Sequence, residues 1–186
     1  MLAISEAVNN GLISDCQVAV VISDKTGAEG LQKARERNLE TLVITRQGHT
    51  REEHDALIIV ELKKRNVELV CLAGYMRLLS KTFVRAFPNK ILNIHPSLLP
   101  SFKGLDAQRQ AIEYGVKVSG CTVHLVDESL DNGAIILQKA VEVLDDDTPE
   151  TLSTRILKHE HALYVEAVKR IVEGNYEIVA RRIVFK

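Results

Sequence analysis

The sequence predicts an α/β domain with a mostly parallel sheet, helices on both of its faces and an antiparallel C-terminal portion. Over residues 16–94, short apolar runs rich in β-branched residues alternate with longer amphipathic stretches. This alternation is typical of βαβ units, which build parallel sheets covered by helices. Beyond residue 115, two apolar runs are separated by a turn-rich segment, which indicates an antiparallel pair at the end of the sheet.

The first half of the chain supplies the parallel units. Apolar residues at helical spacing predict a helix over Met1–Asn10. Four apolar runs are expected to be strands: Cys16–Ser23, Thr41–Ile44, Glu68–Ala73 and Ile91–Ile94. Two amphipathic stretches between them, Ala28–Arg37 and Arg51–Asn66, are expected to be helices. The second has its acidic residues early and its basic residues late, which favours a helix because this order suits the helix dipole.

The second half is expected to hold the antiparallel pair and a long helix. Val116–Val126 and Ala134–Val143 have the character of strands, and the segment between them, Asp127–Gly133, is rich in turn-forming residues. A helix from Pro149 to Glu173 follows, with Asp147 or Thr148 as its N-cap. The run Ile178–Phe185 is expected to form a terminal strand.

Composition indicates a globular protein without an overall basic or acidic field. The 186 residues suit one domain and include 24 Lys and Arg against 25 Asp and Glu, a net charge of −1. Nothing in this balance points to nucleic acid or to an anionic membrane. No apolar run approaches the ~20 residues of a membrane span, and the first residues lack the basic region of a signal peptide. We therefore expect a cytoplasmic protein that binds no nucleic acid and no membrane; the composition leaves open whether it is a monomer or a homodimer.

The three cysteines, Cys16, Cys71 and Cys121, lie far apart and form no C-x-x-C pair. An odd number at such spacing argues against a disulfide framework or a zinc site. Cys71 and Cys121 each lie in an apolar run, where a cysteine usually serves as a small buried hydrophobic residue. We therefore expect no metal at these positions.

A polar pair at the end of a buried strand is the first candidate for chemistry. Asn93 and His95 are two residues apart, so their side chains share one face of the strand. Pro96 then stops the strand, and Pro100 and Gly104 shape the loop that follows. Ligands of α/β sheets bind outside the carboxyl ends of strands, where this pair would lie. A structural histidine is the alternative, since a lone histidine at a strand end is more often structural.

Two further segments carry candidate residues. His124 precedes the loop Asp127–Gly133, in which Asp131 comes before an Asn-Gly turn that can hold its carboxylate in a defined place. A solvated hairpin turn is the alternative there. In the segment Leu72–Leu79, Gly74 allows the chain to turn out of the sheet, and its bulky apolar residues could line a site for a flat heteroaromatic ligand. Alternatively, the leucines of this segment are simply part of the core.

Together these segments resemble one family. Asn-Ile-His-Pro-Ser-Leu-Leu-Pro at residues 93–100, His124 with Asp127–Gly133, and Leu72–Leu79 are similar in order and spacing to phosphoribosylglycinamide formyltransferases of purine biosynthesis. The resemblance extends over nearly the whole chain and implies a Rossmann-like formyltransferase fold, with residues 1–186 as a single formyltransferase domain. Relatives usually open with a strand and a Gly-Ser-Asn loop for the phosphate of the nucleotide. The domain is therefore expected to be N-terminally truncated relative to the family.

The resemblance also implies roles for individual residues. His95 matches the catalytic histidine, Asn93 the amide beside it, and Asp131 the carboxylate that favours the protonated imidazole. Residues matching the positions that bind the co-substrate 10-formyltetrahydrofolate are Arg51, Met76, Arg77, Leu78, Leu79 and Asn93. Glu160 matches the position that meets the ribose hydroxyls of glycinamide ribonucleotide. Lys103 departs from the family, in which many relatives carry proline.

The implied reaction moves a formyl group onto an amine. Negative charge develops on the formyl oxygen during attack, and an imidazolium and an amide N–H aimed at it can contribute about 3–4 kcal/mol per donor. No serine or cysteine nucleophile is required, so we expect direct transfer without a covalent intermediate. One alternative is hydrolysis of 10-formyltetrahydrofolate by a similar set of residues. Another is a truncated folate-binding fragment without nucleotide binding.

Overall fold

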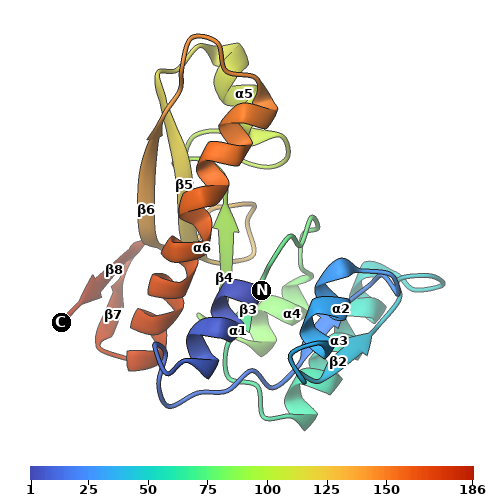
Figure 1. Cartoon of the computed structure of the whole chain (residues 1–186). Coiled ribbons are helices and arrows are strands. Elements are labelled where there is room, and N and C mark those ends of the chain that lie inside the picture. Colours follow the sequence, from blue (N-terminus) through green and yellow to red (C-terminus); the bar gives the residue numbers. More distant parts are fainter.

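The computed structural model describes all residues from Met1 to Lys186, arranged as two sheets with helices packed around them (Figure 1). The smaller sheet pairs β1 (Val21–Ser23) with β2 (Thr41–Val43) in parallel. Helix α1 (Leu2–Asn9) precedes β1, helix α2 (Glu29–Arg35) lies between β1 and β2, and helix α3 (Arg51–Lys64) follows β2. Thr50 begins α3 with a capping box, since its side chain accepts the Glu53 N–H while Glu53 accepts the Thr50 N–H.

The larger sheet has six strands in the order β3-β4-β5-β6-β8-β7. Its strands are β3 (Val70–Cys71), β4 (Ile91–His95), β5 (Val118–Leu125), β6 (Ile135–Glu142), β7 (Tyr176–Val179) and β8 (Arg182–Phe185). β3 pairs with β4 in parallel, whereas β4, β5 and β6 are antiparallel neighbours. Helices α4 (Lys81–Ala86), α5 (Ala107–Tyr114) and α6 (Pro149–Glu173) complete the chain. The predicted α/β class with an antiparallel C-terminal portion is confirmed, but the strands form two sheets, and only half of the strand pairs are parallel.

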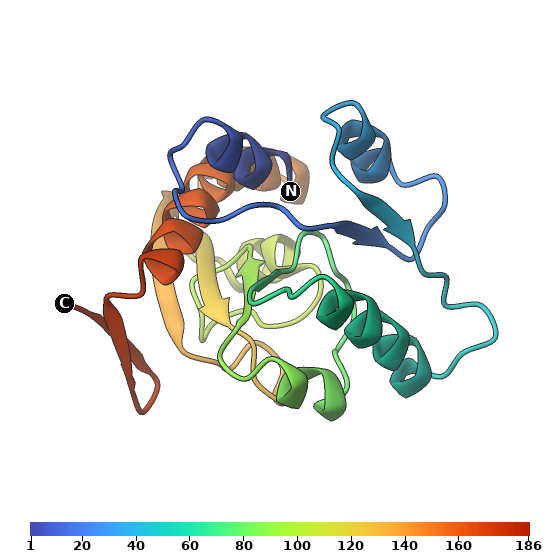
Figure 2. The same cartoon turned by 90° about the horizontal axis from the view of Figure 1, so that it is seen from below.

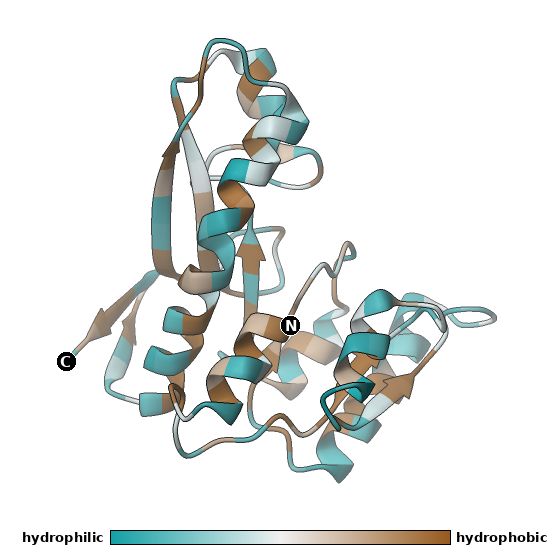
Figure 3. Cartoon of the chain, viewed as in Figure 1, coloured by the Kyte–Doolittle hydropathy of each residue, from teal (hydrophilic) through white to brown (hydrophobic).

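Helices cover both faces of β4. Leu92 belongs to a buried cluster with α1 and α6 residues, among them Ala7, Tyr164 and Ala167. Ile91 belongs to a second cluster with α3 and α4 on the opposite side. Figure 2 shows α1 lying along α6 on one side of the larger sheet. In Figure 3, β4 is largely hydrophobic, while α6 carries hydrophilic residues along its length, as expected for a helix with one exposed side.

Several expected boundaries are corrected by the structure. The expected strand Cys16–Ser23 is regular only at Val21–Ser23, because its partner β2 offers three residues for pairing. Glu68–Ala73 shortens likewise to Val70–Cys71. The single terminal strand over Ile178–Phe185 is wrong: the chain turns at Ala180, whose φ is +54°, and forms the hairpin β7–β8. Helices α4 and α5 were not expected.

The other expected helices and strands begin and end within two residues of the predicted bounds. The long helix α6 spans the expected residues, and Thr148 is its N-cap, accepting the Thr151 N–H. Asp147 instead accepts the Leu144 N–H and pairs with Arg155. Cys121 is fully buried and Cys71 is partly buried against the core. None of the helices combines the length and apolar character needed to span a membrane.

Candidate functional site

Asn93 and His95 are presented by β4 on the face turned toward α3 and α4. In the antiparallel pairing with β5, Asn93 lies opposite His124 and His95 opposite Thr122. Because side chains alternate along a strand, these four residues share one face, while Leu92 and Ile94 on the other face pack against the cluster that includes α6. Two polar side chains, Asn93 and Thr122, and the histidine pair are thus gathered on one face of the paired strands β4 and β5.

Asp131 lies between the two histidines. Its Oδ2 is 3.5 Å from His95 Nδ1, and its Oδ1 is 3.7 Å from His124 Nε2. The Asp131 side chain is only 10% exposed, and its Oδ2 also accepts the Gly104 N–H at 2.9 Å. The structure therefore brings the three predicted catalytic residues together, with His124 as a fourth member.

Hydrogen bonds define the state of the His124 ring. Its Nδ1 lies 2.9 Å from the Leu125 carbonyl oxygen, an acceptor, so Nδ1 carries a proton. Nε2 lies 3.3 Å from Asn93 Nδ2 and accepts from that amide. Burial lowers the pKa of His124, which agrees with this neutral ring. His124 thus fixes the orientation of the Asn93 amide and leaves one amide N–H of Asn93 directed elsewhere.

His95 is held from two sides. Its Nε2 lies 2.8 Å from the Phe102 carbonyl oxygen, so Nε2 carries a proton and donates. Its Nδ1 faces Asp131, and the residue is only 5% exposed. A ring with a protonated Nε2 and a carboxylate beside Nδ1 is suited to donate a proton or a hydrogen bond.

The loop after β4 is built around the Thr122 hydroxyl. This hydroxyl donates to the Ser97 carbonyl at 2.7 Å and accepts the Leu99 N–H at 3.1 Å. Gln138 of β6 also donates to it, at 3.0 Å, and to the Leu99 carbonyl at 2.9 Å. These buried contacts fix residues 97–99 and so support the course of the chain toward Phe102.

The loop from Asp127 to Gly133 is tied down at several points. Arg85 of α4 pairs with Glu128 at 2.8 Å, and Arg181 donates to the Asn132 carbonyl at 2.7 Å. Lys103 donates to the Asn132 side chain at 3.2 Å. Gly133 passes close to β5, where a Cβ atom would lie 1.8 Å from the Leu125 carbonyl oxygen. The left-handed conformation of Asp131, with φ +44°, completes the turn.

The segment expected to bind folate follows β3. Met76 and Leu78 are 74% and 52% exposed, while Leu79 packs against the core cluster of α3 and α4. Arg51 begins α3 and forms an exposed ion pair with Glu52 at 2.8 Å. No hydrogen bond or ion pair joins these residues to Asn93, His95 or Asp131.

Glu160 is not brought to the catalytic trio. It lies on α6, near Cys121, whose side chain points away from the face that carries Thr122 and His124. Burial raises the pKa of the Glu160 carboxyl, and its side chain forms no ion pair or hydrogen bond within the chain. The carboxylate is therefore free to accept hydrogen bonds.

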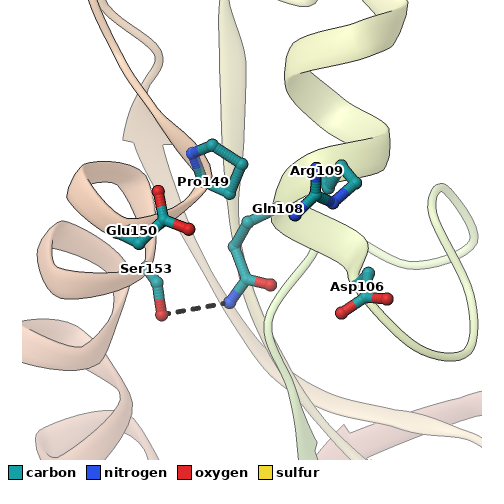
Figure 4. A pocket seen from close by; sticks show the side chains of 6 residues that line it. All are labelled: Asp106, Gln108, Arg109, Pro149, Glu150 and Ser153. Atoms are coloured by element: carbon teal, nitrogen blue, oxygen red, sulfur yellow. Dashed lines mark hydrogen bonds between the residues drawn. The ribbon is translucent and has the colours of Figure 1, made fainter.

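Two surface depressions lie away from these residues. One, of about 350 Å³, is bordered by the first turns of α5 and α6, where Gln108 donates to Ser153 at 3.5 Å (Figure 4). The other, of about 640 Å³, is bordered by residues 24–28 and 45–47 after β1 and β2. Neither contains a residue predicted for the site. The chain also holds no group of three or more His, Cys, Asp or Glu residues arranged for a metal ion.

Several partners of the trio were not predicted. The backbone groups of Phe102 and Gly104 leave no signature in the sequence, because any residue could supply them. Thr122 could have been found, since it lies two residues before His124 and must share its face. Gln138 could not, because its contact depends on the register of β5 and β6.

Known proteins similar to this chain indicate its family. Residues 2–168 match the family described as Formyl transferase. A Bacillus subtilis protein named phosphoribosylglycinamide formyltransferase is 42% identical over 162 residues, which cover 87% of this chain and 83% of that protein. A Chironomus tentans trifunctional purine biosynthetic protein adenosine-3 is 44% identical over 171 residues, but this chain spans only 12% of its length.

Solved structures agree with this relationship. Glycinamide ribonucleotide transformylase 1 from Symbiobacterium toebii is 50% identical, with a TM-score of 0.95 over 98% of this chain and 86% of that one. A formyltetrahydrofolate deformylase from Pseudomonas syringae pv. tomato is 26% identical, with a TM-score of 0.88 over all of this chain and 62% of that one.

Proposed function

Since this chain belongs to the phosphoribosylglycinamide formyltransferase family, we propose that it transfers the formyl group of 10-formyltetrahydrofolate to the amine of glycinamide ribonucleotide, in purine biosynthesis. The observation that carries this proposal is the grouping of Asn93, His95 and Asp131 at the end of β4. In this proposal residues 1–186 act as one formyltransferase domain on small molecules.

The trio would stabilise charge on the formyl oxygen. The protonated Nε2 of His95 donates to the Phe102 carbonyl oxygen, so this donor is already placed to bind a carbonyl oxygen. In the reaction the formyl oxygen would replace that carbonyl as the acceptor, with the Asn93 amide as the second donor. Preorganised donors of this kind act most strongly where charge develops during the reaction.

The remaining steps balance without a covalent enzyme intermediate. The amine nitrogen forms a bond to the formyl carbon, and the bond from that carbon to N10 of the folate breaks. The amine loses one proton, and N10 gains one. Asp131, beside the His95 ring, would favour the protonated imidazole and help relay this proton, either directly or through water.

The two substrates would approach from different elements. We assign the folate to Arg51, Asn93 and the segment Met76–Leu79, in which exposed apolar side chains adjoin free backbone groups. We assign the ribose hydroxyls to Glu160, whose half-buried carboxylate forms no hydrogen bond or ion pair within the chain. Glu160 lies on the far side of β5 from the trio, so this assignment depends on a nucleotide that extends past the strand.

A product assay with and without the nucleotide amine tests the proposal. The full chain is incubated with 10-formyltetrahydrofolate, and formylated nucleotide and free formate are both measured. We expect formylated nucleotide that forms only when glycinamide ribonucleotide is present. Formate release at the same rate with and without the nucleotide would favour hydrolysis. This second candidate is considered because one structural relative is a formyltetrahydrofolate deformylase.

A further inference from the structure

A buried polar cluster lies between α3 and the segment that follows β3. His54 and Asp55 are 1% and 0% exposed, although their side chains carry ionisable groups. They lie one turn after Arg51, on the side of α3 that faces Tyr75, Arg77 and Ser80. Neither residue forms a hydrogen bond or ion pair with the trio at β4. Buried ionisable groups of this kind are costly and call for a structural or functional reason.

Each of the two residues holds one part of the segment. Asp55 Oδ2 accepts the Ser80 N–H at 2.6 Å, a short bond to a charged acceptor. His54 Nε2 donates to the Ile44 carbonyl at 2.7 Å, which leaves Nδ1 as an acceptor facing Arg77 Nη1 at 3.4 Å. The His54 ring therefore links Ile44, the residue after β2, to Arg77.

Asp55 also faces Tyr75. Burial raises the pKa of the Tyr75 hydroxyl to about 12, and the charge of Asp55 acts in the same direction. Both the Tyr75 hydroxyl and Asp55 Oδ1 are buried without a hydrogen-bond partner. Burial of the Asp55 carboxylate therefore costs desolvation energy, and the only hydrogen bond that offsets this cost is the one from the Ser80 N–H.

The backbone between residues 73 and 79 has no other regular support. None of these residues forms a backbone–backbone hydrogen bond, whereas the Leu72 N–H bonds to the Leu92 carbonyl just before them. Figure 1 shows the segment as the loop that leaves β3 and leads into α4. It is anchored at Leu72 by the sheet and at Ser80 by Asp55, and its N–H and C=O groups remain available to a ligand.

We propose that Asp55, together with His54, is a positioning residue that holds the backbone of residues 75–79 in the shape that binds the folate. This inference rests on the proposed function, which assigns that segment to the folate. It explains the shape of the segment by the carboxylate of Asp55, which itself touches no substrate. Loss of Asp55 should therefore weaken folate binding and leave the chemical step at His95 intact.

The test uses the full chain with Asp55→Ala, Asp55→Asn and a matched control, Asp147→Ala. The Asp147 side chain is 2% exposed and also accepts a backbone N–H, that of Leu144 at 2.8 Å. It precedes α6, whose first turn lies at the opposite end of the molecule from α3 (Figure 1). Binding of tetrahydrofolate, KM for 10-formyltetrahydrofolate, kcat and Tm are measured for each form.

We expect Asp55→Ala to weaken tetrahydrofolate binding and raise KM for the formyl donor about tenfold or more, since a hydrogen bond to a charged group is lost, with kcat little changed. Asp55→Asn should restore binding, because its amide oxygen can accept the Ser80 N–H. Asp147→Ala should lower Tm without changing the affinity. If Asp55→Ala does not fold, Asp55→Leu takes its place, because its branched side chain fills the space of the carboxylate while still removing the acceptor of the Ser80 N–H.

Unchanged folate affinity in the folded Asp55 variant would overturn the inference, and so would an equal loss of affinity in Asp147→Ala. Both of these results would leave the proposed function standing if the wild-type chain transfers formyl. A wild-type chain that neither binds tetrahydrofolate nor transfers formyl would instead overturn the proposed function, and the inference with it.

Discussion

The carboxylate of Asp131 faces the imidazole of His95, with Oδ2 3.5 Å from Nδ1, and the same oxygen accepts the Gly104 N–H at 2.9 Å. One carboxylate therefore joins three parts of the chain: the end of β4, the loop after it and the loop after β5. Its charge and its hydrogen bond can be separated by mutation, because an asparagine keeps the second and removes the first.

Replacement of Asp131 with asparagine should reduce turnover while the protein remains folded. The asparagine oxygen can still accept the Gly104 N–H, but the negative charge beside the His95 ring is lost. We expect kcat to fall about 100-fold or more, within the range of general acid–base contributions, and Tm to change little. Asp145→Asn, on an exposed aspartate near α6, should keep the wild-type kcat. A wild-type kcat for Asp131→Asn would contradict the role of its charge.

Gly133 should be indispensable for a reason of space. A Cβ atom at this position would lie 1.8 Å from the Leu125 carbonyl oxygen, which belongs to the backbone of β5 and cannot move aside cheaply. We expect Gly133→Ala to lower the free energy of unfolding by about 2 kcal/mol or more, as strain in a packed region does. In Gly27→Ala the added Cβ meets nothing within 4 Å, so this variant should match the wild type in chemical denaturation.

Asp147 should make stability depend on pH in the acid range. Its hydrogen-bonded pair with Arg155 holds the pKa of this carboxyl well below its usual range. A lowered folded-state pKa means that the stabilisation is present above about pH 4 and is lost as the pH falls toward the folded-state pKa. Urea unfolding at pH 7 and pH 3 should therefore show a wild-type advantage over Asp147→Asn that shrinks at pH 3. An advantage that is constant or larger at pH 3 would contradict this linkage.

Much of the fold could be predicted because the signals are local. The long helix α6 has a proline at its first position and a capping threonine just before it, and its bounds were predicted correctly. The hairpin β7–β8 was mistaken for one strand because Ala180, a residue that rarely adopts positive φ, makes its turn. Helix α4 has only six residues, too few for a clear periodic pattern.

Part of the candidate site could likewise be predicted from local signals in the sequence, and part of it could not. The period-two spacing of Asn93 and His95 placed both side chains on one face, and the Asn-Gly turn after Asp131 indicated a carboxylate held in place. Their convergence could not follow from spacing, because it depends on the pairing of β4 with β5 and on the close approach of Gly133 to Leu125. The backbone partners Phe102 and Gly104 could not be predicted either, because any residue can supply a backbone group.

The rate of formyl transfer in a single turnover, measured for the wild type and for His95→Ala, tests the central role of the trio most directly. The binding of tetrahydrofolate is measured on the same samples, and His49→Ala, at an exposed histidine, serves as the control. We expect the His95→Ala rate to fall by about 100-fold or more, with unchanged tetrahydrofolate affinity and a wild-type rate for His49→Ala. A His95→Ala rate near that of the wild type would contradict the account.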